Sequence, residues 1–334
     1  MPKYLSSPTH SFTIPSIYDG IQLSCRIYLP QQLLDSHATS QCGVQGAIVA
    51  HPYASLGGCY DDPVVSFIGG ELLDDGYVVG TFNFRGAGDS QGRTSWTAKP
   101  EMADYASFYG FMTLYLHYLK LDLASRSDRE STEGGIHIIL GGYSYGSLVA
   151  SHLPASEVIA DLFKDGIQGS PTHGIYVTAK TVFALSKDEI PRSTQQPNLD
   201  VQSASQDTKE SLVSSSTTVS YLLISPLLPP INSFLTLFLD LSLEVDTQAS
   251  GQRRQIPCPS PIEQLCGHRT LAIYGDGDTF TSVSKLRKWS GELKSVRQSQ
   301  FNSSEIEGAG HFWREDGVEQ EARQALRLWL HRRP

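Results

Sequence analysis

Residues 135–150 read GIHIILGGYSYGSLVA: an apolar and β-branched run, a serine between glycines, and a second apolar run. The first run predicts a buried strand from Gly135 to Leu140, and Leu148 to Ala150 can start a helix. A sharp turn between the two would push the Ser144 hydroxyl out of the sheet, and the nearby glycines would let the backbone pack closely. The pattern therefore predicts a strand–turn–helix unit with Ser144, a candidate nucleophile, at its tip.

The pentapeptide 142–146 matches Gly-x-Ser-x-Gly, and so does the pentapeptide 88–92 around Ser90. In a chain with 29 glycines this pattern is weak evidence by itself. Ser90 follows the loop residues 85–88 and has no apolar helix directly behind it. Context therefore favours Ser144, and two alternatives stay open: Ser90 as nucleophile, or an incidental serine in a glycine-rich turn.

Strands alternate with helices before this unit. A hairpin is indicated by Asp19-Gly20 between two strand-like segments. The predicted strands are His10–Ile17, Ile21–Leu29, Gly46–Ala50 and Tyr77–Phe84, and the predicted helices are Pro63–Leu73 and a long amphipathic helix, Met102–Leu121. This alternation predicts an α/β fold with a largely parallel sheet.

The pattern weakens after residue 154. We expect a single domain over residues 1–334, in which residues 155–220 form a polar, partly disordered insertion or lid, because 191–220 is rich in Ser, Thr, Gln and Asp. Regular structure is then predicted as strands Tyr221–Ser225, Arg269–Tyr274 and Gln298–Ile306, an apolar helix Ser233–Leu243 and a terminal helix Val318–His331. Residues 221–239 carry no charge, but three prolines among them disfavour a membrane span.

Composition excludes some classes of partner and site. The formal net charge of −9 disfavours nucleic acid and anionic membranes as partners. The cysteines are odd in number and scattered, so neither a zinc site nor a disulfide framework is indicated; they are Cys25, Cys42, Cys59, Cys258 and Cys266. The first residues contain no apolar run typical of a signal peptide, so a cytoplasmic location is the default expectation.

A nucleophilic serine needs an adjacent base. Of the ten histidines, His311 is the best candidate, because it lies in a loop of small residues just after the last predicted strand. His51 is a rival, but it precedes Ser144 in the chain and lies near the loop expected to stabilise an oxyanion. His117 and His137 fall in a helix and a strand, where packing or surface roles are expected.

The base in turn needs a carboxylate to orient it. Asp276 and Asp278 both follow the predicted strand that ends at Tyr274. Asp278 is favoured because the position three residues after the strand-ending glycine can reach the loop that holds the histidine. Asp276 is the alternative, and a purely polar turn that closes the strand also stays open.

Two backbone N–H groups are candidates for binding an oxyanion. The first belongs to Tyr145, at the start of the predicted helix. The second should come from the loop 51–59 behind the strand Gly46–Ala50, where a Gly-Gly pair would let the backbone bend back. Tyr53 is the first choice for this donor and Ala54 the second; an ordinary turn is the alternative.

Together, the His-Pro…Gly-Gly segment at 51–58, the segment 83–90, the Ser144 turn and Gly310-His311-Phe312 resemble the α/β-hydrolase superfamily, above all a group of small, largely uncharacterised serine hydrolases. The resemblance covers roughly residues 20–150 and 221–334. It implies an eight-stranded, mostly parallel sheet flanked by helices, a cap or lid in the insertion, no metal and no organic cofactor. It also implies a Ser144–Asp278–His311 triad, in the chain order of that superfamily. Arg85 matches a feature of the family, and we interpret it as a structural residue that anchors loops near the site.

The reaction implied is hydrolysis of a carboxylic ester or thioester through an acyl-enzyme, with a small acyl compound as partner. The segment Ser233–Leu243 and Trp313 would either line an apolar acyl pocket or belong to the core. Two other functions stay open: a lyase, cyclase or acyltransferase on the same scaffold, and a non-catalytic ligand-binding protein. The sequence indicates neither the substrate nor the oligomeric state.

Overall fold

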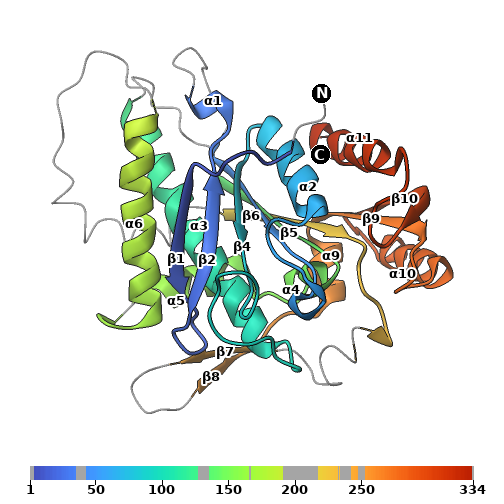
Figure 1. Cartoon of the computed structure of the whole chain (residues 1–334), viewed down its shortest axis with the longest axis horizontal. Coiled ribbons are helices and arrows are strands. Elements are labelled where there is room, and N and C mark those ends of the chain that lie inside the picture. Colours follow the sequence, from blue (N-terminus) through green and yellow to red (C-terminus); the bar gives the residue numbers. More distant parts are fainter. Residues whose placement is uncertain are drawn as a thin grey trace.

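The computed structural model describes residues 4–34, 43–126, 135–164, 167–190, 217–231, 233, 242–246 and 253–332. Eight strands form one sheet: β1 (His10–Pro15), β2 (Gln22–Tyr28), β3 (Gln45–Ala50), β4 (Val78–Phe82), β5 (Ile136–Tyr143), β6 (Thr217–Ile224), β9 (Arg269–Gly277) and β10 (Phe301–Gly310). Their order across the sheet is β1-β2-β4-β3-β5-β6-β9-β10. The predicted α/β-hydrolase fold, with a mostly parallel eight-stranded sheet, is confirmed (Figure 1).

The antiparallel part of the sheet is confined to its first strands. β1 and β2 pair in an antiparallel hairpin around the predicted Asp19-Gly20 turn, and β2 is antiparallel to β4. Every later neighbouring pair is parallel. The carboxyl ends of β3, β4, β5, β9 and β10 therefore lie along one edge, where ligands bind in open α/β sheets.

Helices cover both faces of the sheet (Figure 1). They are α1 (Gln31–Leu34), α2 (Pro63–Asp74), α3 (Lys99–Arg126), α4 (Tyr145–Ala150), α5 (Ser156–Lys164), α6 (Pro171–Glu189), α9 (Pro261–Gly267), α10 (Val283–Ser295) and α11 (Val318–His331), with a short 3-10 helix η1 (Ala54–Leu56). Buried side chains of α2 and α11 share a core on one face of the sheet. Those of α3, α5 and α6 share the core on the other face.

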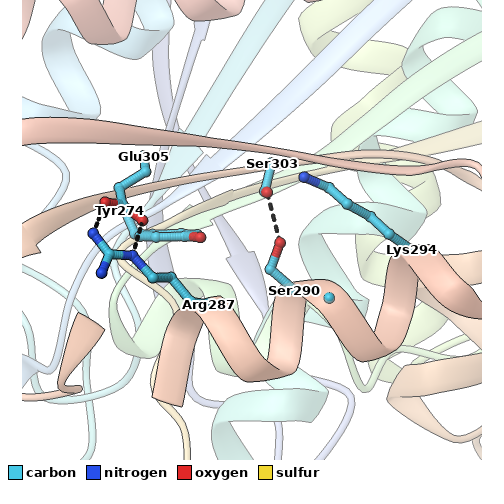
Figure 2. A pocket seen from close by; sticks show the side chains of 7 residues that line it. Tyr274, Arg287, Ser290, Lys294, Ser303 and Glu305 are labelled. Atoms are coloured by element: carbon cyan, nitrogen blue, oxygen red, sulfur yellow. Dashed lines mark hydrogen bonds and ion pairs between the residues drawn. The ribbon is translucent and has the colours of Figure 1, made fainter. Parts of the chain in front are cut away.

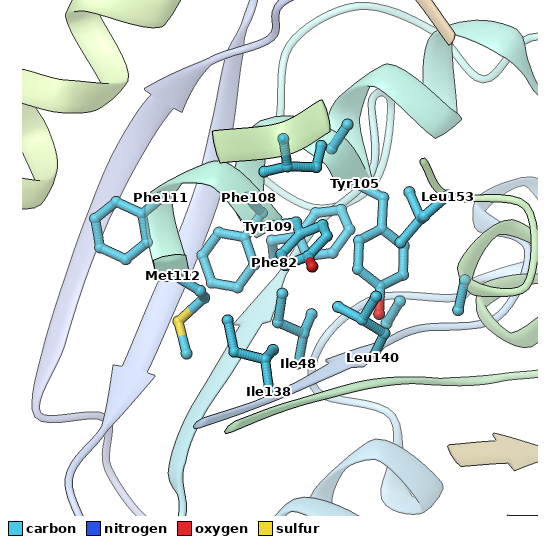
Figure 3. Close-up of a cluster of buried hydrophobic side chains, with 14 of the residues drawn as sticks. Ile48, Phe82, Tyr105, Phe108, Tyr109, Phe111, Met112, Ile138, Leu140 and Leu153 are labelled. Atoms are coloured by element: carbon cyan, nitrogen blue, oxygen red, sulfur yellow. The ribbon is translucent and has the colours of Figure 1, made fainter. Parts of the chain in front are cut away.

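The prediction of a long amphipathic helix at Met102–Leu121 is correct for the helix and wrong for its amphipathic character. Residues 100–119 of α3 are buried all round. Its inner side packs on the sheet: the rings of Phe108 and Phe82 lie 5.1 Å apart, and Phe108 and Met112 lie against Gly80 of β4 (Figure 3). Its outer side is covered by α5 and α6, and a Cβ on Gly110 would lie 2.1 Å from the ring of Phe163. A second helical layer therefore buries the side of α3 that faces away from the sheet, so the helix has no solvent-exposed polar face over these residues.

Described residues within the segment 155–220, predicted as an insertion or lid, form α5, α6 and the start of β6. Ser170 caps α6 by accepting a hydrogen bond from His173 N at 3.2 Å, and Pro171 is its first residue. Tyr115 Oη on α3 donates to Ser186 Oγ on α6 at 2.8 Å. The first part of this segment is therefore a packed layer, and the division into one domain with a lid stays a prediction.

Most of the predicted apolar helix Ser233–Leu243 lies outside the described residues. Its last residue, Leu243, begins β7 (Leu243–Asp246), which pairs antiparallel with β8 (Arg253–Ile256) in a small second sheet that the sequence did not predict. Residues 221–224, the start of the charge-free stretch, belong to β6 inside the main sheet. Within the described ranges, no helix has the length and apolar character needed to cross a membrane.

Candidate active site

Ser144 lies between the end of β5 and the start of α4, so the predicted strand–turn–helix unit is present. Its backbone has φ 55° and ψ −111°, in the left-handed half of the map that non-glycine residues rarely adopt. Such a conformation costs of order 1–3 kcal/mol and persists only where the surroundings impose it. Ser144 N donates to Ile224 O of β6 at 2.8 Å, which anchors the turn to the neighbouring strand.

Close packing around the turn requires its two glycines. A Cβ on Gly146 would lie 2.4 Å from Ala50 O, and a Cβ on Gly142 would lie 2.3 Å from the carbonyl carbon of Gly146. Both contacts are with backbone, which cannot move aside cheaply. The glycines therefore hold α4 against the end of β3, as the sequence pattern predicts.

The structure brings Ser144, His311 and Asp278 into one hydrogen-bonded chain. Ser144 Oγ lies 2.9 Å from His311 Nε2, and His311 Nδ1 lies 2.7 Å from Asp278 Oδ2. The three residues, in the order Ser144, His311 and Asp278, are 6%, 3% and 7% exposed. A hydrogen bond from His311 Nδ1 to the Asp278 carboxylate requires the ring proton on Nδ1, and in that tautomer Nε2 can accept from the Ser144 hydroxyl.

Asp278 is held by the backbone that follows it. Its Oδ1 accepts hydrogen bonds from Phe280 N at 2.8 Å and Thr281 N at 2.9 Å, and its Oδ2 accepts from His311. These donors fix the orientation of the Asp278 carboxylate. The carboxylate therefore faces the imidazole without needing any other side chain to position it.

Asp276, the alternative acid, has a different partner. Its Oδ1 accepts from Gly308 N at 2.7 Å, at the irregularity in β10 between Ile306 and Gly310. β10 extends to Gly310 rather than ending at the predicted Ile306, so His311 directly follows it. Asp276 thus binds the backbone of β10, the strand that ends directly before His311, whereas Asp278 contacts the His311 imidazole itself.

His51, the rival base, is completely buried behind the site. Its Nε2 accepts from Phe84 N at 2.9 Å, and its Nδ1 lies 2.6 Å from Pro52 O. Burial lowers the pKa of His51 from its ordinary value of 6.5 to about 4, so it is neutral. Both ring nitrogens serve the backbone, which makes His51 a structural residue.

Ser90, His137 and His117 all lie within the framework of the fold. Ser90 Oγ donates to Asn83 O and accepts from Ser24 N, both at 2.8 Å. His137 Nε2 lies 2.9 Å from Ser220 Oγ on the neighbouring strand. His117 is buried on α3, and neither of its ring nitrogens has a hydrogen-bond partner among the described residues.

The loop after β3 lies beside the Ser144 turn. The ring of Tyr53 meets the ring of Tyr145 edge-on, with centroids 5.1 Å apart. Gly57 has φ 87°, and Gly58 N donates back to Tyr53 O at 3.2 Å, so the Gly-Gly pair does bend the loop on itself. The assignment of the Tyr145 and Tyr53 N–H groups to an oxyanion site stays a prediction.

Aromatic side chains that the sequence reasoning missed surround His311. The Phe280 ring lies 4.3 Å from the imidazole centroid at 32°, and the Phe312 ring lies 5.5 Å away at 88°. Tyr143 packs at 5.6 Å, and its Oη donates to His311 O at 2.8 Å. Their sequence positions, next to Ser144, Asp278 and His311, were the only available signal.

Trp313 and Arg85, two further residues discussed in the sequence analysis, have structural roles. Trp313 is buried in the core beside Phe67, and its Nε1 donates to Ser225 Oγ at 3.0 Å; it is core rather than pocket lining. Arg85 makes ion pairs with Asp104 at 2.7 Å and Asp19 at 3.0 Å. This confirms the structural role expected for Arg85, which ties the β1–β2 turn to α3.

Two cavities in the described part of the molecule lie elsewhere. One, of about 310 Å³, is lined by α10 and β10 and contains the Arg287–Glu305 ion pair and the Ser290–Ser303 hydrogen bond (Figure 2). The other, of about 590 Å³, lies at the amino ends of β5, β6 and β9. Neither is lined by Ser144, Asp278 or His311.

Comparisons with known proteins find similarity among solved structures. No family model matches the chain, and no curated protein matches it. Solved structures do match over nearly its whole length. An α/β serine hydrolase homologue from Coxiella burnetii has 16% identity, covers 98% of each chain and gives a TM-score of 0.47.

Two further structures are similar in the same way. An α/β serine hydrolase without a lid from Xanthomonas campestris has 15% identity, coverage of 99% of each chain and a TM-score of 0.48. A protein of unknown function from Agrobacterium tumefaciens, described as a putative α/β hydrolase, has 16% identity, 95% coverage of each chain and a TM-score of 0.49. The assignment of the fold rests on the strand order of this chain itself.

Proposed function

We propose that the protein is a serine hydrolase that cleaves a carboxylic ester or thioester with Ser144 as nucleophile, His311 as base and Asp278 as the acid that orients it. One observation carries the proposal: two consecutive hydrogen bonds, of 2.9 and 2.7 Å, join the three side chains. They lie at the carboxyl ends of three parallel strands, where this fold carries its reactive groups.

The reaction proceeds in two halves. Ser144 Oγ attacks the substrate carbonyl while His311 Nε2 takes its proton, and Asp278 stabilises the imidazolium that forms. The backbone N–H groups of Tyr145 and Tyr53 bind the oxygen that becomes negative. His311 then returns the proton to the leaving oxygen or sulfur, and water, activated by the same imidazole, releases the acid from Ser144.

The backbone of Ser144 favours catalysis over simple ligand binding. Its strained φ of 55° costs stability, and the three polar side chains are almost completely buried. A receptor gains nothing from this arrangement, because hydrogen bonds between its own side chains leave fewer groups for a ligand. A lyase, cyclase or acyltransferase would use the same residues and differ in its products.

Labelling with a fluorophosphonate tests the proposal directly. The wild-type protein and Ser90→Ala should be labelled on the peptide that contains Ser144, whereas Ser144→Ala should not react. Simple esters of increasing acyl-chain length should then release free acid, which product analysis detects. Labelling without release of acid from any ester or thioester would favour lyase, cyclase or acyltransferase chemistry, and absence of labelling would contradict the triad.

A further inference from the structure

We infer that Phe280 and Phe312 form an apolar binding site for the leaving group, so that the preferred substrate is an ester or thioester with a bulky apolar, uncharged alcohol or thiol. This inference rests on the proposed function and concerns the half of the substrate that departs first. It assigns a specificity role to two residues that lie beside His311 and outside the proposed triad.

The position of the leaving group follows from the proton it must receive. His311 Nε2 takes the proton of Ser144 and delivers it to the departing oxygen or sulfur, so that atom must come within hydrogen-bond reach of Nε2. The substituent on that atom therefore extends past His311, whatever acyl group is bound to Ser144. Side chains that contact the imidazole and reach solvent are the ones that this substituent meets.

Phe280 and Phe312 meet this condition. The Phe280 ring lies tilted against the imidazole at 4.3 Å, and Phe312 lies edge-on to it at 5.5 Å. The two phenyl rings also contact each other, with centroids 5.8 Å apart at 81°. Phe280 is partly exposed and Phe312 is 52% exposed, so the pair offers apolar surface beside the His311 imidazole.

The chain that carries both rings is anchored next to each of them. Phe280 N donates to the Asp278 carboxylate, which fixes the start of that loop. Phe312 lies between His311 and Trp313, and Trp313 is anchored by its hydrogen bond to Ser225. A single exposed phenylalanine needs no explanation, but a pre-organised pair against the proposed base offers binding surface at little entropic cost.

Charge narrows the class of leaving group. Aromatic rings beside an active site commonly bind cations. Here the Arg314 guanidinium already lies 5.4 Å from the centroid of the Phe312 ring. The Asp62 and Glu315 carboxylates interact with this guanidinium and offset its charge. Its effect on a cationic leaving group is therefore to occupy the face of the Phe312 ring, which a neutral apolar group does not need.

The test compares two acetate esters, ethyl acetate and 2-phenylethyl acetate, which form the same acetyl-enzyme. The wild-type protein should prefer 2-phenylethyl acetate in kcat/KM. Phe312→Ala and Phe280→Ala should each lower the ratio of the two kcat/KM values by about 10- to 100-fold. Phe312→Leu should lower it less. Leu328→Ala, at a 51% exposed residue on α11, is the matched control and should not change the ratio.

Two results would overturn the inference. The wild-type protein could hydrolyse both esters with equal kcat/KM, or the phenylalanine variants could lose both activities equally, which would assign the rings to positioning His311. Fluorophosphonate labelling of Ser144 in each variant checks that the site is assembled. If the wild-type protein neither reacts with the label nor hydrolyses ethyl acetate, the proposed function itself fails, and this inference with it.

A second pair of esters tests the charge argument. Acetylcholine and 3,3-dimethylbutyl acetate have leaving groups of the same shape, and only the first is cationic. The neutral ester should be preferred, and Arg314→Gln should narrow the difference. Preference of the wild-type protein for acetylcholine would overturn the assignment to an uncharged leaving group.

Discussion

Two pentapeptides in this molecule share the Gly-x-Ser-x-Gly pattern, but the hydroxyl groups of their central serines have different partners. In residues 88–92, Ser90 uses its hydroxyl to bond two backbone groups, Asn83 O and Ser24 N. Around residues 142–146 the next residue, Ser147, has that role, because its Oγ donates to Gly142 O at 2.6 Å and accepts from Ile224 N at 3.1 Å. Ser144 Oγ is thereby left for His311. A serine becomes available for chemistry when another residue meets the needs of the backbone around it.

The largest expected effect separates the two serines. Ser144→Ala should lower kcat on an ester by about 10,000-fold or more, because it removes the nucleophile. Ser90→Ala should keep kcat within a few-fold and lower the free energy of unfolding by about 1–3 kcal/mol, because two backbone groups lose their partner. Ester kinetics and urea denaturation measure both. Loss of turnover in Ser90→Ala without loss of stability would contradict the structural role of Ser90 and assign it a role in catalysis.

The two aspartates extend the same contrast. Asp278→Asn should lower kcat by roughly 10,000-fold, because an amide no longer fixes the required tautomer of His311. Asp276→Asn should leave kcat within a few-fold, because this carboxylate binds Gly308 N rather than His311 and the amide oxygen of asparagine can still accept that bond. Kinetics of both variants at one pH, with thermal melts as the control for folding, check this. Equal and mild losses of kcat at both positions would contradict the assignment of Asp278.

The last glycine of each pentapeptide should also respond differently to substitution. Gly146→Ala would place a Cβ 2.4 Å from Ala50 O and should largely prevent folding. Gly92→Ala introduces strain at φ 81°, but its nearest neighbour is the end of the Ile21 side chain, which can move, so a loss of about 1–2 kcal/mol is expected. Soluble yield and urea denaturation distinguish the two. A stable Gly146→Ala protein would mean that α4 can move away from β3.

An effect of pH on stability is expected from His51, whose backbone oxygen lies beside Gly146 of the second pentapeptide. Burial lowers the pKa of His51 to about 4, so the unfolded chain binds a proton at higher pH than the folded one. The free energy of unfolding should therefore fall as pH falls from 6.5 to 4, by up to about 1.4 kcal/mol per pH unit for this group. His51→Gln should reduce that slope. His117 and His137, whose pKa values burial also lowers to about 4, should still contribute to the pH dependence of the free energy of unfolding in this variant.

Sequence reasoning was most accurate where local pattern and tertiary role agree. The predicted bounds of α11, Val318–His331, are those observed, because one apolar stripe faces the core. The prediction that α3 is amphipathic was wrong, because a helix that comes later in the chain covers its outer face. The sequence analysis also did not predict α5, α6 or the β7–β8 sheet. Periodicity reports how apolar a face is, but not which later segment will cover it.

The same distinction applies to the site. Ser144, Asp278 and His311 could be proposed because each follows a strand, and strand ends converge at one sheet edge. The contacts of Phe280 and Tyr143 with His311 could not, because they depend on how two loops fold against each other. The role of Ser147 was missed for a related reason: a hydroxyl two residues inside a helix gives no sign of which carbonyl it will meet.

The burial of α3 on every side limits how far this protein can be shortened. An engineer who removed residues 156–190 as a dispensable cover would strip the outer wall from a helix that carries Phe111, Tyr115 and Tyr118. The exposed aromatic strip would invite aggregation. The same aromatic side chains are uncovered for a time during synthesis on the ribosome. A nascent chain that ends near Ala150 contains α3 but not yet α5 and α6, the two helices that cover it.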